Sequence, residues 1–533
     1  MLVFNIEIVM KKHMYILMLV ASFLMVACDS LDLNPEDFYG AGNFWKEKGQ
    51  VESFIIGLHR DVRENYKNYF LYGEARGGTL LTGVSSVGTS LDYEVIKLNN
   101  LSQDTYGIGN WGEFYTYILQ VNHAIDNLEN VCSFLSEDDL NYYKGQAYGL
   151  RAFMYFWLYR SYGGVPLELE VKVADGSFDV TDLYLERASA ESVLQQIKED
   201  LQKSEDYFSN SSNGNSNYYF WSKYATQMLK AEVYLWSAKV MTGNHPVGGI
   251  EDLQIAKKAL EQIVGHFSLV DNYEKLFDAS DKSAAQKEII FSIYFDKKEY
   301  TNWGDFFVYS SAQFIGQSWD DTGNLYQDPL DLCGSGLLRH EYKESFVKSF
   351  DKKDSRRYAT FLEYYRDEDL TIFGASMKKM LGSVDSGKRY YDSDIHIYRY
   401  ADALLMMAEV ENGLSGHCAD YINQVRKRAY GEYFTDDCKY VDGDYAENEL
   451  AILKERDKEF VAEGKRWFDL IRLHDKNKEP LVFSDVAAYA TTYGEKPNSV
   501  LKKDSESYKL LWPIEKTLMD RDPKLEQTPG YEE

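Results

Sequence analysis

Helical spacing of apolar and small residues dominates the chain. Three stretches, 137–162, 221–241 and 396–411, place such residues three and four positions apart, which puts them on one face of an α-helix. Small residues in the first stretch would let a neighbouring helix approach closely, and the Gly-Gly-Val-Pro run at 163–166 predicts where it ends. The recurring positions are Gly145, Gly149, Ala152, Met228, Ala231, Leu235, Ala238, Ile397, Ala401, Leu404, Leu405 and Ala408.

The three stretches share a fragment of the tetratricopeptide pattern. Each contains an alanine followed four residues later by a large apolar residue, as in Ala152 and Phe156. The copies do not follow the 34-residue period of a regular array, so we expect tetratricopeptide-like helix pairs with long insertions. The polar turn at 209–217 and the stretch at 294–339 lack helical periodicity. A long irregular segment in a compact protein is usually functional.

The N-terminus has the features of an export signal. Two lysines precede a 12-residue apolar run at 15–26, which is too short to span a bilayer but suits a signal-peptide core. Met10 is therefore the more natural start. The run ends in Met-Val-Ala-Cys, which resembles a bacterial lipobox, so we expect residues 1–27 to be removed and Cys28 to carry the lipid anchor.

Composition narrows the class of protein. The 533 residues carry 85 acidic and 58 basic side chains, and a net charge of −27 argues against binding to nucleic acid or to an anionic membrane surface. We therefore expect membrane contact through the lipid anchor only. Aromatic residues make up 15% of the chain, and tyrosine is the commonest of them. Tyrosine suits both cores that meet water and surfaces that hold ligands, so composition leaves both roles open.

Motifs for metal, cofactor or nucleophile chemistry are absent from the sequence. It has no GxSxG, HExxH or Walker motif, and its cysteines are not in CxxC spacing. An exported location permits disulfides without fixing their pairing. The acidic turns at 392–394 and 442–444 could contribute to a calcium site, but neither completes a ligand loop, so solvated turns are favoured and no cofactor or metal is assigned. Beyond Cys28, the cysteines are Cys132, Cys333, Cys418 and Cys438.

A carboxylate-rich stretch at 454–472 invites a catalytic interpretation, because paired carboxylates cleave glycosides. Its small and apolar residues recur at helical spacing, which predicts one helix with a buried stripe and with i,i+3 ion pairs on its exposed face. Scaffold is therefore favoured, and no catalytic residue is assigned. The stripe is Phe460, Gly464, Trp467 and Ile471, and the pairs are Glu463 with Arg466 and Asp469 with Arg472.

Five blocks of sequence, at 31–45, 151–167, 396–430, 453–472 and 511–531, occur in the order typical of one known family. They include RAFMYFWLYRSYGGVPL, HIYRYADALLMMAEVENGL, LKERDKEFVAEGKRWFDLIR and LWPIEKTLMDRDPKLEQTPGY. In these blocks the chain strongly resembles the SusD/RagB family of outer-membrane lipoproteins, and the resemblance extends from the lipobox cysteine to the C-terminus.

This resemblance implies a single all-α domain over 28–533, built on tetratricopeptide-like helix pairs, with loop excursions that form a ligand face. It implies a non-enzymatic, lipid-anchored protein of the outer membrane that faces the cell exterior. Such a protein binds oligosaccharide or polysaccharide and delivers it to a SusC-like TonB-dependent transporter. The alternative is a peptide-binding member of the same family that serves protein scavenging. A glycoside hydrolase or lyase and a purely structural adaptor are the weaker rivals.

The irregular stretch at 294–339 holds two tryptophans outside the predicted helices. Exposed aromatic rings stack on the apolar faces of sugars, while neighbouring amides and acids bond the sugar hydroxyl groups. The resemblance also places an earlier loop, 76–111, on the ligand face. The candidate ligand residues, assigned by position, are Trp303, Trp319, Tyr309, Asn302, Asp305 and Asp320 from the first segment and Arg76, Tyr106, Asn110 and Trp111 from the second.

Overall fold

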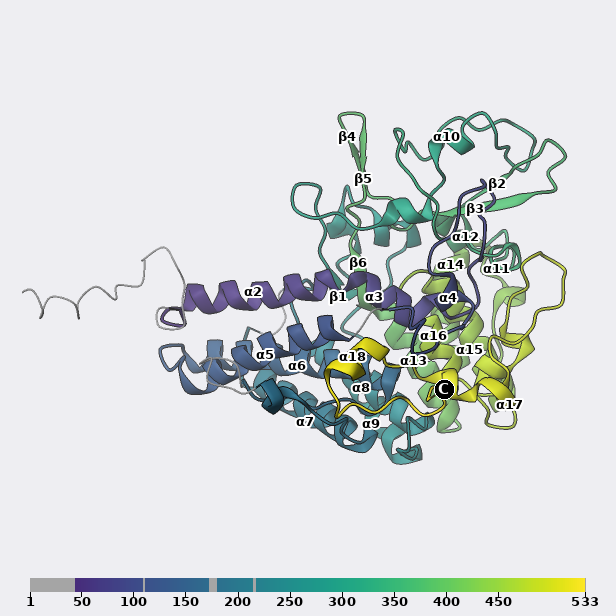
Figure 1. Ribbon diagram of the computed structural model, residues 1–533. Helices are drawn as coiled ribbons and strands as arrows, with labels where there is room; N and C mark the ends of the chain where they lie inside the picture. The colour runs from purple at the N-terminus through teal and green to yellow at the C-terminus, as the bar shows by residue number, and fades with distance from the viewer. Residues whose placement is uncertain (1–43, 109–110, 172–179, 214–216, 533) are drawn as a thin grey trace, which may run out of the picture.

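The computed structural model describes residues 44–108, 111–171, 180–213 and 217–532. Helices form its lower body, and loops with short strands form a lobe above them (Figure 1). Among the described residues, no helix combines the length and the apolar character needed to cross a membrane. The predicted signal peptide and Cys28 lie outside the described residues.

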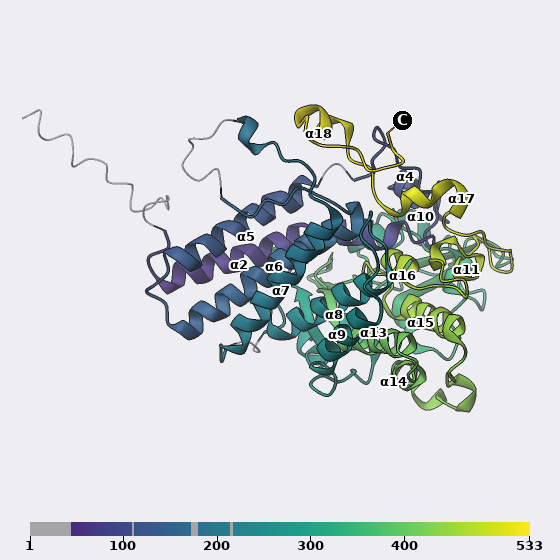
Figure 2. The same cartoon turned by 90° about the horizontal axis from the view of Figure 1, so that it is seen from below.

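Six long helices form the N-terminal part of the body, each packed against the next. Figure 2 shows α2, α5, α6 and α7 lying side by side, followed by α8 and α9. Ser136, Ser189 and Ser222 begin three of them, each accepting a hydrogen bond from the backbone N–H three residues later. The six are α2 (Lys48–Glu64), α5 (Gly112–Asn130), α6 (Glu137–Tyr162), α7 (Ala190–Ser209), α8 (Lys223–Lys239) and α9 (Gly249–Glu261).

The helices predicted at 137–162 and 221–241 are confirmed, and so is the close packing that small residues allow. A Cβ atom added at Gly145 would lie 3.0 Å from the Phe208 ring of α7. One added at Gly149 would lie 2.0 Å from Nε1 of Trp221, just before α8. Glycine at 149 therefore lets a fully buried tryptophan pack directly on the backbone of α6.

Four more helices continue the body towards the C-terminus. α13 packs on α8 and α9 and also on α14 and α15, so helix pairs follow one another through both halves of the chain (Figure 2). This arrangement confirms the predicted all-α class with tetratricopeptide-like pairs. The four are α13 (Tyr400–Gly413), α14 (Ala419–Tyr430), α15 (Tyr445–Glu459) and α16 (Arg466–Arg472), and the short helices elsewhere are α3 (Tyr66–Phe70), α4 (Glu94–Lys97), α17 (Lys503–Glu506) and α18 (Lys516–Arg521).

Strands β1 (Ile289–Ile293) and β6 (Ile395–Arg399) pair antiparallel at the base of the upper lobe. The chain between them contains three short helices, two small antiparallel hairpins and a separate apolar cluster around Tyr309 and Phe314. Within 294–339 the helical elements, α10 among them, are only four residues long, which agrees with the predicted lack of helical periodicity. The elements are α10 (Ser311–Phe314), α11 (Glu344–Val347), α12 (Ser355–Thr360), β2 (Phe361–Tyr365), β3 (Phe373–Met377), β4 (Ser383–Asp385) and β5 (Lys388–Tyr390).

Two predicted helices have different boundaries in the structure. Residues 396–399 belong to β6, because their backbone pairs with β1, and α13 begins only at Tyr400. The single helix predicted over 454–472 is wrong: α15 and α16 are separated by a loop in which Ala462 and Gly464 have positive φ angles. The Glu74 carboxylate accepts hydrogen bonds from the backbone N–H groups of these two residues, at 2.9 and 3.2 Å, and so stabilises the break.

A buried carboxylate joins α15 to three other elements. Glu459 pairs with Arg356 at 2.9 Å, with Arg399 at 2.5 Å and with Arg428, and none of the four side chains is more than 3% exposed. The arginines come from α12, β6 and α14. Because a buried charge is tolerated only when it is paired, this cluster fixes how the helices meet.

The ion pairs predicted within 454–472 are only partly right. Asp469 and Arg472 do pair, at 2.9 Å, but both side chains are buried rather than on an exposed face. Glu463 does not pair with Arg466, because the loop after α15 turns it towards Arg399, at 2.8 Å. These carboxylates are therefore held inside the protein by arginines.

Candidate functional site

Trp303 does not form an exposed platform. Trp303 is 3% exposed, and its ring packs edge-on against the rings of Phe70 and Phe307, with centroid distances of 5.5 and 5.7 Å. Asn302 is also buried, and its amide donates to the Ser393 carbonyl at 2.8 Å while its oxygen accepts from the backbone of the following turn. The predicted ligand role of both residues is corrected, because the Trp303 ring is packed inside the protein and the Asn302 amide is bonded there.

Tyr309 and Asp305 belong to the interior of the lobe as well. Tyr309 is fully buried, stacks on Phe314 with ring centroids 3.7 Å apart, and donates its hydroxyl to Asp328. The predicted contact between Tyr309 and a ligand is therefore corrected. Asp305 is half-buried, and burial raises the pKa of its carboxyl group. Its ligand role stays a prediction.

The second predicted segment is mostly scaffold. Arg76 is fully buried, with its guanidinium 4.0 Å from the Trp467 ring centroid and 4.9 Å from that of Trp512. Trp111 precedes α5, is 5% exposed and packs against Tyr162. Both are therefore corrected to packing residues that join distant segments.

Two other members of that segment remain open. Tyr106 is half-exposed, and the nearby Glu515 carboxylate raises the pKa of its hydroxyl. Its ligand role stays a prediction. Asn110 lies outside the described residues.

Trp319 and Asp320 remain on the surface of the lobe. The backbone of Trp319 exchanges two hydrogen bonds with Tyr365, at 2.9 and 2.8 Å, which fixes this turn against β2. The Asp320 carboxylate accepts from the backbone N–H groups of Asn324 and Thr322, and these bonds lower its pKa to about 2. Both are half-exposed beside the groove described below, and their ligand roles stay predictions.

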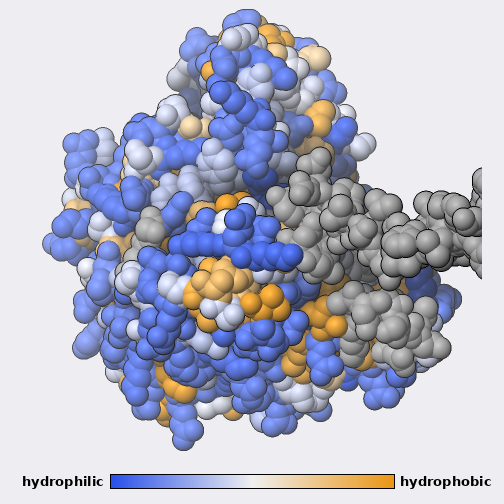
Figure 3. Space-filling model, turned by 90° about the vertical axis from the view of Figure 1, so that its left-hand side faces the viewer, coloured by the Kyte–Doolittle hydropathy of each residue, from blue (hydrophilic) through white to orange (hydrophobic). Residues whose placement is uncertain are grey.

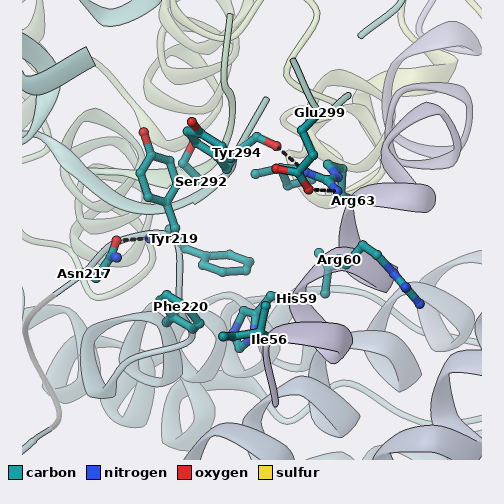
Figure 4. A pocket seen from close by; sticks show the side chains of 13 residues that line it. Ile56, His59, Arg60, Arg63, Asn217, Tyr219, Phe220, Ser292, Tyr294 and Glu299 are labelled. Carbon is teal, nitrogen blue, oxygen red and sulfur yellow. Dashed lines mark hydrogen bonds and ion pairs between the residues drawn. The ribbon is translucent and has the colours of Figure 1, made fainter. Parts of the chain in front are cut away.

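One hollow, of about 250 Å³, lies between α2 and β1. We call it the α2–β1 hollow, and Figure 4 shows its lining. Its walls are largely apolar and aromatic, and they come from α2, from the segment before α8 and from the end of β1. Lining residues include His59, Arg63, Tyr219, Phe220, Tyr294 and Glu299.

Polar groups of the α2–β1 hollow already bond one another. The guanidinium of Arg63 pairs with Glu299 at 2.6 Å, and Figure 4 shows these two side chains pointing towards each other. Tyr219 donates its hydroxyl to Asp394 at 2.7 Å. His59 is held between the Ile55 carbonyl and a backbone N–H, and burial lowers its pKa to about 4, so it is neutral. Few donors or acceptors are left for a polar ligand.

A second hollow, of about 520 Å³, lies along α12 and β2. Four tyrosines line it, and we call it the tyrosine groove. Tyr358 and Tyr493 are 51% and 60% exposed, whereas Tyr326 and Tyr365 are half-buried. The hydroxyl groups of Tyr358, Tyr365 and Tyr493 form no hydrogen bond with any residue that the structure describes, so they face solvent. The four are Tyr326, Tyr358, Tyr365 and Tyr493.

Charged side chains alternate with the rings of the tyrosine groove. The ammonium group of Lys348 lies 5.9 Å from the Tyr365 ring centroid and 5.7 Å from that of Tyr493. Both rings therefore contact the same cation. Arg357 binds Glu363 through two parallel hydrogen bonds at the edge of the groove. Rings with unoccupied hydroxyl groups and a charged rim can contact both the apolar faces and the hydroxyl groups of a sugar.

The groove tyrosines were not predicted from the sequence. Tyr358 lies on α12, Tyr365 ends β2, and Tyr493 belongs to a loop before α17. No local pattern connects them, because they meet only through the packing of β2, α11 and the 484–502 segment. The half-exposed Tyr326, inside the predicted stretch 294–339, was the one signal that pointed to this place.

The two acidic turns have structural partners. Asp392 accepts from the Ser383 backbone at 2.8 Å, and Asp394 pairs with Lys282 at 2.6 Å, so the solvated interpretation of 392–394 is wrong. Asp444 caps α15. The four cysteines in the described part of the chain are all free. Over the same residues, no group of three or more His, Cys, Asp or Glu side chains is placed to hold a metal ion.

Two family models match the chain. The model of the SusD family matches residues 366–531, and a model described as starch-binding associating with outer membrane matches residues 47–235. Together they take in α2 to α7, most of α8, and α13 to α18. They leave out 236–365, where three of the four groove tyrosines lie, so the groove is built largely outside the matched segments.

Similar proteins cover almost the whole chain. SusD-like protein P38 of Formosa agariphila is 26% identical over 97% of this chain and 98% of its own length. A solved SusD superfamily protein from Bacteroides fragilis is 37% identical and covers 92% of this chain and 100% of its own, with a TM-score of 0.83. The structure of NanU from B. fragilis is 34% identical, with coverage of 94% and 100% and a TM-score of 0.78.

Proposed function

The chain belongs to the SusD/RagB family, and from this premise we propose that it binds oligosaccharide or polysaccharide at the cell surface and passes it to a SusC-like TonB-dependent transporter. The matched model described as starch-binding associating with outer membrane supports both the ligand class and the location. Fold alone does not assign a ligand, so the proposal also needs a site of suitable chemistry.

The tyrosine groove is the observation that carries the proposal. Its volume of about 520 Å³ lies within the ~300–1,000 Å³ range of ligand pockets. Two strongly exposed rings, Tyr358 and Tyr493, offer faces for sugar rings, and three tyrosine hydroxyl groups are left to exchange hydrogen bonds with sugar hydroxyls. An unligated protein rarely leaves several large aromatic rings exposed together unless they contact something.

The α2–β1 hollow is the weaker site for such a ligand. It is about half the volume, and its tyrosine hydroxyls and its guanidinium are bonded inside the protein. A saccharide placed there would have to break the Arg63–Glu299 pair or leave its own hydroxyl groups unpaired. Either change costs free energy that stacking on one small aromatic surface would not offset.

The way in which two of the carboxylates are held supports binding without hydrolysis. A glycoside hydrolase needs two carboxyl groups about 5–10 Å apart and free to exchange protons with the substrate. Glu363, at the groove, is engaged by both nitrogens of a bidentate arginine, and Glu459 is paired with three arginines in the interior. Both carboxylates are therefore taken up by arginines, and neither is placed to act as the acid or base of a glycosidase.

Lipid attachment at Cys28 would hold the protein at the outer membrane. The chain before the first described residue is long enough to link an anchored Cys28 to α2. Figure 3 shows the end of the molecule where α2 begins, on which hydrophilic side chains predominate and hydrophobic ones form small separate patches. A predominantly polar surface of this kind needs a separate anchor to stay at a membrane.

Calorimetric titration against panels of oligosaccharides and peptides tests the proposed ligand class. We expect saturable binding of at least one saccharide, and no release of reducing ends when that saccharide is incubated with the purified protein. Binding of peptides alone would replace the proposal with the protein-scavenging alternative. Release of reducing ends would show an enzyme.

A further inference from the structure

A third hollow, of about 330 Å³, lies where α4 meets the residue before α11 and the segment 488–500. We call it the lysine pocket. Three lysines and one glutamate line it, together with polar residues that include Asn99, Thr491 and Ser499; the charged residues are Lys97, Lys343, Lys496 and Glu495. The segments that carry Lys97 and Lys343 are adjacent, because the backbone N–H of Asp92, just before α4, donates to the carbonyl of Arg339, four residues before Lys343.

Lys97 is buried and Lys343 is half-buried, and neither has a counter-ion among the described residues. Lys97 is 6% exposed, and its ammonium donates to the Arg339 carbonyl at 3.2 Å. Lys343 donates to the Tyr489 carbonyl at 3.1 Å. Neither forms an ion pair with any of the described residues, and burial lowers the pKa of each ammonium group to about 8. A buried lysine is ordinarily paired, so the unpaired Lys97, with the half-buried Lys343 beside the same hollow, needs an explanation.

Nearby charges do not supply the missing partner. Glu495 also lines the pocket, but it is exposed and forms no ion pair with Lys97 or Lys343 in the described part of the chain. Asp92, Glu94 and Glu341 act on Lys97 only at a distance, and Glu341 is occupied by hydrogen bonds from the Ser86 backbone and hydroxyl group. Arg466 lies close enough to lower the pKa of Lys343 further. The pocket is therefore locally cationic in a chain whose net charge is −27.

Each ammonium group has three protons, and one is used by a backbone carbonyl. The remaining protons can donate to an anion with several oxygens, and hydrogen bonds between ionised partners are the strong ones. The hydroxyl groups of Thr491 and Ser499 add neutral donors at the rim. An acceptor of this kind would restore the pairing that burial has removed from Lys97 and Lys343.

The lysine pocket and the tyrosine groove are built from the same two chain segments. Lys343 and Lys348 stand at the two ends of α11, and each lines one of the hollows. Thr491 lines the pocket and Tyr493 lines the groove, two residues apart. A ligand long enough to extend from the groove along α11 would therefore reach the pocket. Elsewhere a strongly acidic protein repels an anionic ligand.

We propose that the lysine pocket binds an oxyanion group, a carboxylate or a sulfate ester, carried by the saccharide held in the tyrosine groove. The inference rests on the proposed function for the source of the anion, whereas the pocket's preference for oxyanions does not depend on it. An acidic or sulfated glycan is therefore the substrate class that this structure fits best.

Calorimetric titration at constant ionic strength and pH 7 tests the proposal with three probes: inorganic sulfate, tri-galacturonic acid and neutral galactotriose. The variants are Lys97→Met and Lys343→Met, which keep an apolar stem and remove the charge. Lys454→Met is the matched control. Its ammonium is buried to a similar pKa of about 8 and lies over the Tyr489 ring, but it does not line the pocket.

We expect sulfate and tri-galacturonic acid to bind wild type, and both pocket variants to weaken that binding at least tenfold. Lys454→Met should stay within threefold of wild type. The pocket variants should also melt no lower than wild type, because they remove a buried unpaired charge. If the two lysines had only a structural role, the pocket variants would melt below wild type. Their affinity for anions would then equal that of Lys454→Met.

The outcomes separate this inference from the proposed function. Neutral galactotriose binding without any anion binding would overturn the lysine pocket and leave saccharide capture standing. Sulfate binding that depends on Lys97 and Lys343, without binding of any saccharide, would support the pocket and overturn the saccharide as its source. No binding of either anion to wild type at millimolar concentration overturns the inference.

Discussion

Gly149→Ala tests the close packing that organises the N-terminal helices. The new Cβ atom would lie 2.0 Å from Nε1 of Trp221 and 2.6 Å from its Cδ1, well inside van der Waals contact. Trp221 is fully buried, and its Nε1 donates to the Thr226 hydroxyl at 2.9 Å. The ring therefore has to move, and its hydrogen bond has to lengthen or break.

The expected cost follows from three effects. Overpacking a buried site costs about 1–3 kcal/mol. Loss of the Trp221–Thr226 hydrogen bond adds about 1 kcal/mol. Alanine is the better helix former by about 1 kcal/mol, which works in the opposite direction. We therefore expect Gly149→Ala to reduce the free energy of unfolding by about 2 kcal/mol.

Gly57→Ala in α2 is the matched control for this substitution. A Cβ atom there would meet no atom within 4 Å, so only the gain in helix propensity applies and stability should rise by up to about 1 kcal/mol. Urea unfolding followed by far-UV circular dichroism measures both changes. If Gly149→Ala were as stable as Gly57→Ala, Trp221 would not lie against α6 as the structure has it, and the reasoning would fail.

Two further predictions concern the anchor and a buried acid. Cys28→Ala should abolish labelling by fatty acid and move the protein from the membrane fraction to the soluble one. Unchanged labelling would refute the lipid anchor at Cys28. Burial raises the pKa of Glu74 to about 7, above its ordinary value of 4.5, so the folded chain keeps this proton where the unfolded chain has lost it. Stability from this group is therefore fully present below about pH 4.5 and is lost as the pH rises to about 7, by about 3 kcal/mol in all. Urea unfolding of wild type and Glu74→Gln at pH 5 and pH 8 should show this loss in wild type only, and equal pH dependence of the two proteins would refute it.

The helices whose signals are local in the sequence were predicted correctly. Both ends of the helix predicted at 137–162 agree with the structure, in which Ser136 caps the start and Gly163 takes a positive φ at the end. The helix pairs and the irregular stretch at 294–339 were likewise predicted from the local spacing of apolar and polar residues. The break between α15 and α16 was not, because it depends on the Glu74 carboxylate, almost 400 residues away in sequence. Residues 396–399 likewise form a strand only because β1 lies beside them.

The candidate site was predicted less well than the fold. An irregular segment indicates that a tryptophan lies outside a helix, but not that it is exposed, and Trp303 is packed under its own loop and against α3. Exposure depends on tertiary packing, which also brings together Tyr358, Tyr365 and Tyr493 from three separate segments. The excess of tyrosine in the composition therefore indicated the kind of side chain in the groove, but not its position.

The affinity of a bound saccharide for three tyrosine variants tests the tyrosine groove most directly. Tyr358→Ala and Tyr493→Ala remove the two most exposed rings of the groove, whereas Tyr433→Ala removes a ring that is equally exposed, at 50%, but lies outside it. Calorimetric titration should show each groove variant weakened by about 1–3 kcal/mol, the scale of a lost aromatic anchor, and Tyr433→Ala unchanged. Wild-type affinity in both groove variants, or an equal loss in Tyr433→Ala, would contradict saccharide binding in the groove.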